Sequence, residues 1–174
     1  MPHTIKLLNR SFSSQILEIF NDAIVNSTAL YDYKPRTLEM MEQWFTAKEK
    51  GNYPVVGVVD EKNTLLGFGS YGTFRNWPAY KYSVEHSLYV HKEHRGKGVG
   101  SIVLKELIEH AEQQNYHCMI GGIDAQNAAS IALHKKFGFV FCGRINHAGF
   151  KFNRWLDLEF YQLILKTPEN PIDG

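Results

Sequence analysis

The chain has 174 residues, of which 44% are hydrophobic and 21% charged, so its composition is that of a globular domain and argues against disorder. Its 19 Lys and Arg residues nearly balance its 18 Asp and Glu residues, so it lacks the basic excess typical of nucleic-acid or membrane binding. We therefore predict no nucleic-acid and no membrane partner, while a local anion site stays compatible with this charge. At this length we predict a single domain over residues 1–166 and a loose tail at 167–174.

Cysteine usage and the start of the chain predict a cytoplasmic protein. Cys118 and Cys142 form no Cys-x-x-Cys pair, so a secreted disulfide scaffold is not expected. The first residues lack the apolar run of a signal peptide. No apolar stretch approaches the roughly 20 residues that span a bilayer.

Hydrophobic periodicity predicts a strand at residues 4–8 and a helix at 14–26 that Ser13 or Ser14 caps. A second helix is capped by Thr37 and ends at Gly51. Its apolar stripe, predicted to be core, consists of Met40, Met41, Trp44 and Phe45. Further strands are predicted at residues 55–59, 65–73, 82–90, 117–124, 139–145 and 152–165, and further helices at 98–114 and 127–136. Because several strands follow one another directly, we expect an α/β fold of the α+β type. Its mixed, mostly antiparallel sheet is flanked by helices, in the order β-α-α-β-β-β-α-β-α-β-β.

A glycine-rich turn, Arg95-Gly96-Lys97-Gly98-Val99-Gly100-Ser101, joins the predicted strand at 82–90 to a helix. Glycines let a backbone approach a ligand closely, and the first amides of a helix have no partner within the helix. The turn therefore predicts a phosphate-binding site or an ordinary strand-to-helix connection. Val99 follows Gly98 where nucleoside-triphosphate loops carry Lys, and the dinucleotide fingerprint fits poorly, so a dinucleotide oxidoreductase is the weakest hypothesis.

The spacing Arg95-x-x-Gly98-x-Gly100 resembles the pyrophosphate-binding signature of the Gcn5-related N-acetyltransferases (the GNAT superfamily). Residues 71–80 and 83–90 are more specific, because they resemble the phosphinothricin and methionine sulfoximine N-acetyltransferases within it. Further similarity lies in Asn127-Ala-Ala-Ser130, in residues 133–139 and in residues 149–157. The resemblance covers residues 5–165 and implies the GNAT fold.

The same resemblance implies acetyl-CoA as co-substrate. The expected cofactor-binding residues are Leu88, Tyr89 and Val90 beside the pantetheine arm, Arg95, Gly96, Lys97, Gly98, Val99, Gly100 and Ser101 at the pyrophosphate, and Asn127 on the arm. For Asn127, a plain helix N-cap is the alternative role.

Catalysis requires a base for the substrate amine, because an α-amino group titrates at about 8. Glu85 is the expected base, acting directly or through water; a solvent-facing carboxylate is its alternative. Amides near Leu88 would polarise the thioester carbonyl. His134 stands where many relatives have the Tyr that protonates the leaving thiolate, and a surface histidine is the other interpretation. The resemblance implies that a small amino-acid acceptor is faced by Arg75, Asn76, Trp77, Glu85, His86 and Ser87. For Trp77, simple packing is the alternative.

The leading hypothesis is an enzyme that acetylates the α-amino group of a small amino acid such as phosphinothricin, methionine sulfoximine or methionine sulfone. The alternatives are acetylation of a protein N-terminus or another small amine, and a non-catalytic acyl-CoA-binding module. His91, Glu93 and His94 suggest zinc, but no further ligand has convincing spacing, so no metal is expected. The resemblance also implies a homodimer.

Overall fold

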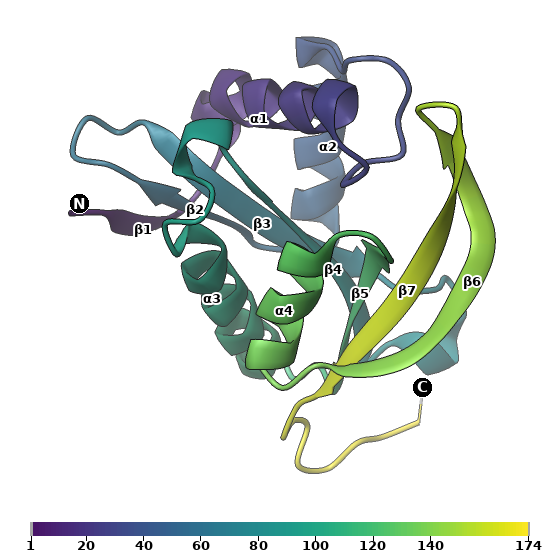
Figure 1. The fold of residues 1–174 in the computed structure, drawn as a ribbon. Helices are drawn as coiled ribbons and strands as arrows, with labels where there is room; N and C mark the ends of the chain where they lie inside the picture. The colour runs from purple at the N-terminus through teal and green to yellow at the C-terminus, as the bar shows by residue number, and fades with distance from the viewer. Residues whose placement is uncertain (1, 174) are drawn as a thin grey trace. The chain divides into compact units, whose positions relative to one another are not determined.

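The computed structural model describes residues 2–173 (Figure 1). Met1 and Gly174, which begin the predicted domain and end the predicted tail, lie outside these residues. The predicted order of elements is confirmed. The helices are α1 (Ser13–Asn26), α2 (Leu38–Lys50), α3 (Val99–Gln113) and α4 (Ala128–Lys136). The strands are β1 (Thr4–Leu7), β2 (Val55–Val59), β3 (Leu65–Thr73), β4 (Ser83–Val90), β5 (Cys118–Asp124), β6 (Val140–Lys151) and β7 (Arg154–Ile164).

The strands form a mixed sheet in the order β1-β2-β3-β4-β5-β7-β6, which confirms the predicted fold class. The pairs β1–β2, β2–β3, β5–β7 and β6–β7 are antiparallel. The pair β4–β5 is parallel, with Ser83 opposite Cys118 and Glu85 opposite Ile120. A parallel pair needs a crossover connection, and α3 supplies it between these two strands.

The chain forms two compact units. Among the described residues, the first contains residues 2–71 together with Ser87–Leu107. Its core forms because α1 is amphipathic and buries Ile16, Ile19 and Phe20, together with other residues on the same face. Phe20 makes edge-on contacts with Phe68 of β3 and Tyr89 of β4, with ring centroids 5.0 and 5.1 Å apart. Helices α1 and α2 also pack against each other (Figure 1).

Capping in the first unit differs in part from the prediction. Thr37 caps α2 as expected, because its side chain accepts a hydrogen bond from the Met40 amide, and Gly51 ends the helix. The prediction that Ser13 or Ser14 caps α1 is wrong. A short 3-10 turn, Arg10–Phe12, precedes that helix, and Asn9 caps this turn through the Ser11 amide instead. The side-chain cap therefore lies before this extra turn, at Asn9, and α1 itself has none.

Burial along the helix α2 and the strand β4 corrects two side-chain assignments. Met41 is buried as predicted, whereas Met40 is exposed. In β4 the buried positions are Val84, His86 and Tyr89, so the spacing is two residues and then three. The alternation predicted over 82–90 therefore changes phase after His86, and Tyr89 turns into the aromatic core.

Among the described residues, the second unit contains Gly72–His86 and residues 108–173. In it β7 pairs with β5 on one side and with β6 on the other, and the β6–β7 hairpin is long and curved (Figure 1). The prediction that the sixth strand ends at residue 145 is wrong. The strand continues because the irregular stretch between Ile145 and Gly149 is bridged by Asp157, whose carboxylate accepts a hydrogen bond from the His147 amide at 2.9 Å.

The segment after β7 has no helix or strand among its described residues, but it makes specific contacts in the second unit. The Thr167 hydroxyl donates to the Tyr116 carbonyl at 2.5 Å, and the Ile172 amide donates to the Tyr82 hydroxyl at 3.1 Å. Two 3-10 turns, Pro78–Tyr80 and Lys92–His94, were not predicted. No helix in residues 2–173 has the length and apolar character needed to cross a membrane.

Candidate active site

The glycine turn of the first unit presents backbone amides at the protein surface. Gly96 and Gly98 adopt positive φ angles of 74° and 84°, which glycine adopts without steric cost. A Cβ on either residue would meet no atom within 4 Å, so the space around both is open. Within residues 2–173, the amides of Gly96, Lys97 and Gly98 donate to no protein acceptor. The turn can therefore receive an anionic ligand through its main chain.

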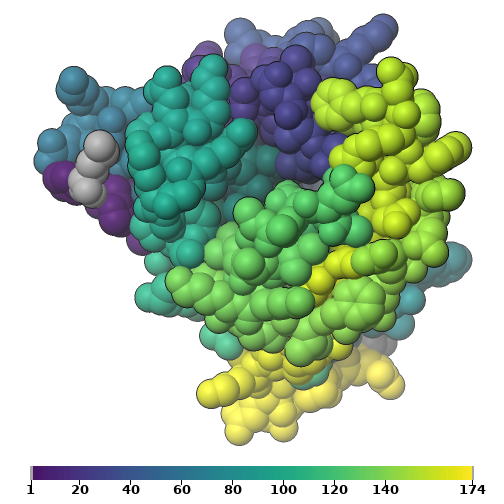
Figure 2. Space-filling view, viewed as in Figure 1, coloured from purple at the N-terminus to yellow at the C-terminus, as the bar shows by residue number. Residues whose placement is uncertain are grey.

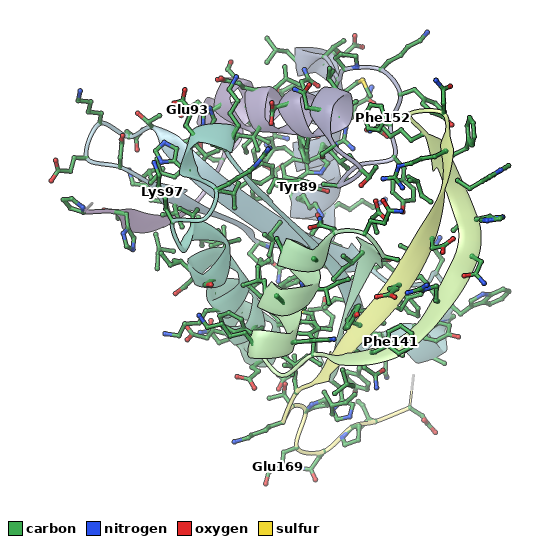
Figure 3. The ribbon with its side chains drawn as sticks, viewed as in Figure 1. Tyr89, Glu93, Lys97, Phe141, Phe152 and Glu169 are labelled. Atoms are coloured by element: carbon green, nitrogen blue, oxygen red, sulfur yellow. The ribbon has the colours of Figure 1, made fainter. Side chains whose placement is uncertain are left out.

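The start of α3 adds to this amide array. The Gly98 carbonyl accepts hydrogen bonds from the amides of Ser101 and Ile102, at 3.0 and 3.2 Å, which closes the first turn of the helix. The segment just before α3 lies at the surface (teal in Figure 2). Lys97 is exposed in this turn, and its side chain is labelled in Figure 3. A cation and the positive end of a helix dipole together favour bound phosphate.

Arg95 has a different environment from Lys97. Its guanidinium forms an ion pair with Asp22 of α1 at 2.6 Å and also donates to the Val90 carbonyl at 3.3 Å. These contacts tie the turn to α1 and to the end of β4. Arg95 was predicted to bring positive charge near the ligand, and in the structure it also holds the glycine turn in position.

Two glycines in β3 let the second half of β4 approach closely. A Cβ on Gly69 would lie 2.9 Å from the Ser87 carbonyl oxygen, and one on Gly67 would lie 3.0 Å from that of Tyr89. Real Cβ atoms essentially never lie under 3.0 Å from such an atom, so Gly69 requires glycine, and a Cβ on Gly67 would force its neighbours to shift. Leu88 and Val90 remain half-buried, on either side of the buried Tyr89. The strand expected beside the pantetheine arm is therefore held by close backbone packing.

In the second unit, Glu85 lies half-buried on the first half of β4. Burial raises the pKa of its carboxyl, and the positive charge of Arg75 opposes this shift. The carboxylate also approaches β5, because a Cβ on Gly122 would lie 3.2 Å from Glu85 Oε1. The alternative of a fully solvent-facing carboxylate does not match this environment. A carboxylate with a raised pKa can act as a base near neutral pH.

The loop before β4 holds the residues expected to face the acceptor. Arg75, Asn76 and Trp77 are all exposed, and Trp77 is 74% exposed, so the packing alternative for its side chain is wrong. The Arg75 guanidinium lies over the Phe74 ring, 5.2 Å from its centroid. Arg75 is thus the loop residue that the structure links electrostatically to Glu85.

His86 and His134 meet inside the second unit. Their Nε2 atoms are 2.8 Å apart, and the side chains are 5% and 3% exposed. The surface alternative for His134 is therefore wrong. His86 was expected to face the acceptor, and the structure places it against His134 and the Ile120 carbonyl instead. No local pattern in the sequence indicates this pair, since its members are 48 residues apart.

Asn127 and the neighbouring turn of α4 also belong to the second unit. The Asn127 side-chain oxygen accepts a hydrogen bond from the Ser130 amide at 3.1 Å, so this residue is the N-cap of α4. Its side-chain NH2 group is not used by the cap. Gly121 was not among the predicted site residues, and a Cβ there would lie 3.0 Å from the His86 ring. The consecutive glycines within a predicted strand were the available signal for such a close approach.

His91, Glu93 and His94 gather on the 3-10 turn before the glycine turn, with their ligand atoms within 4.8 Å of one another. Other partners already engage His91. Its Nδ1 accepts from the Glu93 amide at 3.3 Å, and its Nε2 lies 3.6 Å from a Glu18 carboxylate oxygen. Glu93 is exposed (Figure 3), and Lys92 lies next to it.

Comparison with known proteins shows the family to which this chain belongs. The family model described as the acetyltransferase (GNAT) family matches residues 15–139. An L-methionine sulfoximine/L-methionine sulfone acetyltransferase of Pseudomonas paraeruginosa is 43% identical over 150 residues, which cover 86% of this chain and 87% of the relative.

Solved structures agree with this family. A structure from Acinetobacter baylyi, described as a candidate acetyltransferase, superposes with a TM-score of 0.98 at 52% identity, over 99% of this chain and 97% of the other. A phosphinothricin acetyltransferase of Sinorhizobium meliloti, in complex with acetyl-CoA, gives a TM-score of 0.93 at 32% identity, over 98% and 93% of the two chains. The chain belongs to the GNAT family of acetyltransferases, and it is an N-acetyltransferase.

Proposed function

We propose that this enzyme transfers the acetyl group of acetyl-CoA to the α-amino group of a small amino acid of the phosphinothricin, methionine sulfoximine or methionine sulfone type. The observation that carries the proposal is the half-buried Glu85 carboxylate, whose pKa burial raises. It lies three residues before Leu88 on the same strand. The names of the relatives support both the donor and the class of acceptor.

In the proposed reaction the acceptor amine attacks the thioester carbon, and the C–S bond breaks as the C–N bond forms. Glu85 takes a proton from the amine, directly or through water. Amides near Leu88 stabilise the negative charge on the carbonyl oxygen. The departing CoA thiolate receives a proton, for which we propose His134 as the source. The glycine turn at Gly96–Ser101 and the side-chain amide of Asn127 hold the cofactor.

The charge of the acceptor loop supports an amino-acid substrate. Arg75 is exposed and carries a guanidinium that can pair with two oxygens of a carboxylate, sulfone or phosphinate. The neighbouring Asn76 and Trp77 are exposed as well, which leaves the loop free to contact an acceptor. The proposed acceptor therefore carries an α-amino group and a compact anionic or strongly polar end.

Calorimetry and an acceptor panel test this proposal together. We expect the protein to bind acetyl-CoA, and to release free thiol with methionine sulfoximine, methionine sulfone or phosphinothricin. Peptides with a free N-terminus are the matched alternative acceptors. Thiol release with peptides alone would identify an N-terminal acetyltransferase. Heat of binding without thiol release from any amine would indicate a non-catalytic acyl-CoA-binding module, and no heat at all would contradict the cofactor assignment.

We propose further that two copies associate through the β6–β7 hairpin. The exposed large apolar residues of this hairpin include Val140, Phe141, Ile145, Phe150, Phe152 and Trp155. Phe141 lies on β6 and Phe152 lies at the tip of the hairpin (Figure 3). Apolar patches of this kind usually mark interaction surfaces. Light scattering should give twice the chain mass, and Phe141→Lys should shift it to that of a monomer.

A further inference from the structure

The buried pair formed by His86 and His134 has three contacts of ring nitrogens that are shorter than 3.0 Å. His86 Nδ1 lies 2.9 Å from the Ile120 carbonyl oxygen. His134 Nδ1 lies 2.7 Å from the Ser130 carbonyl oxygen. The two Nε2 atoms lie 2.8 Å from each other. All three distances are those of hydrogen bonds, so each contact needs a proton between its two atoms.

The number of protons distinguishes two states of this pair. A carbonyl oxygen only accepts, so each Nδ1 must carry a proton to donate to its carbonyl. A neutral imidazole has one N–H group, so two neutral rings would then have no proton left for the Nε2 atoms. Their lone pairs would face each other at 2.8 Å. A third proton, held between the Nε2 atoms, satisfies all three contacts, and the pair then carries one positive charge.

The surroundings of the pair contain groups that stabilise such a charge. Two backbone carbonyl oxygens point at the rings, as described above. His134 lies in the last turn of α4, where the helix dipole favours a cation. The Phe139 ring packs against both imidazoles, with centroids 5.3 Å from His86 and 5.1 Å from His134.

Burial acts in the opposite direction and disfavours a charge on either ring. Desolvation lowers the pKa of His86 to about 3, with a further contribution from the positive charge of His134, and it lowers the pKa of His134 as well. Two imidazolium rings in contact are therefore excluded. Glu85 precedes His86 in β4, and Lys135 and Lys136 follow His134 in α4. Among the described residues, His134 is the only ionisable group that shifts the pKa of His86.

Ser130 offers the pair a route to the outside. The Ser130 hydroxyl oxygen lies 3.4 Å from His134 Nδ1. Ser130 is half-buried, whereas both histidines are buried. A proton that leaves His134 Nδ1 can pass to Ser130 Oγ as the hydroxyl proton moves on. The shared proton then settles on His134 Nε2, and two neutral rings remain.

We infer that His86 and His134 together store one proton beyond those of two neutral rings, and that Ser130 passes it to the CoA thiolate. This inference rests on the proposed function for its last step. The thiolate sulfur gains the Ser130 hydroxyl proton, His134 restores that hydroxyl, and the pair later regains one proton from solvent. No electron transfer is involved. His86 is a positioning residue in this scheme, because it acts only through His134.

Proton counting by NMR on the 15N-labelled protein tests the inference without any substrate. Two-bond and three-bond 1H–15N correlations at pH 7 should show three protonated nitrogens among the four of His86 and His134. Spectra of His86→Asn and His134→Asn assign the signals. Two protonated nitrogens would overturn the inference, even if the enzyme transferred acetyl groups normally. Three protonated nitrogens in a protein that binds no acetyl-CoA would instead contradict only the proposed function.

Kinetics of His86→Asn test the role of the stored proton. Asn can still accept a hydrogen bond from His134, but it cannot share a charge. We expect about a tenfold lower kcat, an unchanged KM for acetyl-CoA, and a decline of kcat at high pH that begins at least one pH unit lower. His110→Asn is the matched control, because His110 also lies in the last turn of a helix, α3. A His86→Asn profile with the wild-type pH dependence would overturn the role of the pair in proton delivery.

Discussion

The glycine turn and the Glu85–His86 segment illustrate two ways in which this chain builds a site. The turn uses adjacent residues and main-chain amides, and its two positive φ angles fall on Gly96 and Gly98. The second region uses side chains from β4 and α4 and a backbone carbonyl of β5, and its key contact joins residues 48 positions apart. A backbone site is therefore visible in a short stretch of sequence, whereas a side-chain site is visible only after folding.

The largest expected effect comes from the side-chain region. In Glu85→Gln the carboxylate can no longer take a proton from the amine, so turnover should fall by about 10²–10⁴-fold. Acetyl-CoA affinity should be unchanged, because the glycine turn is intact. In the wild type, burial raises the pKa of Glu85, so the base is protonated at low pH and kcat should rise with pH above the ordinary glutamate value.

Steady-state pH profiles and calorimetry measure both quantities. Glu61→Gln is the control, since Glu61 lies exposed in the turn between β2 and β3. The rise of kcat with pH that belongs to Glu85 should be absent from Glu85→Gln and present in Glu61→Gln. A Glu85→Gln variant with wild-type turnover across the pH range would remove Glu85 from the proposed mechanism.

The backbone region should respond to Gly98→Ala. A left-handed conformation costs an ordinary residue about 1–2 kcal/mol, so the turn should relax and move its amides away from the ligand. We expect acetyl-CoA to bind about tenfold more weakly, as titration calorimetry can measure. Gly138→Ala is the matched control, because Gly138 has a similar φ of 85° but follows α4. It should lower Tm by about 2–8 °C and leave the affinity unchanged. Equal affinity losses in the two variants would refute a specific role for the turn.

The same distinction explains how much of the molecule the sequence predicts. Residues 55–59 and 65–73 were predicted to the residue, since their apolar patterns and the turn between them are local signals. The end of β6 was missed because the bridge from His147 to Asp157 comes from the partner strand. Likewise, the change of phase before Tyr89 depends on packing against Phe20 and Phe68, which no local pattern reveals.

For the site, local motifs predicted which residues would line the turn. They did not predict the contact between the two histidines. His134 was singled out from its motif, yet its burial and its contact with His86 follow from the pairing of β4 with β5 and from the small size of Gly121. Sequence thus predicts residues whose chemistry is fixed by neighbours along the chain. It does not predict protonation states that depend on three separate segments.

Asn127 caps α4 and is also proposed to contact the cofactor, and its substitution should give the smallest effect. Asn127→Ala removes the cap of α4 and should cost about 1 kcal/mol of stability, or about 2–4 °C in Tm. Asn127→Asp keeps an oxygen for the Ser130 amide but removes the NH2 donor, so its Tm should match the wild type. If that donor binds the pantetheine arm, Asn127→Asp should still bind acetyl-CoA about two- to tenfold more weakly, in line with the loss of one hydrogen bond. Wild-type affinity together with wild-type Tm in Asn127→Asp would reduce this residue to a helix cap, and the cofactor would then depend on the backbone region for its hydrogen bonds.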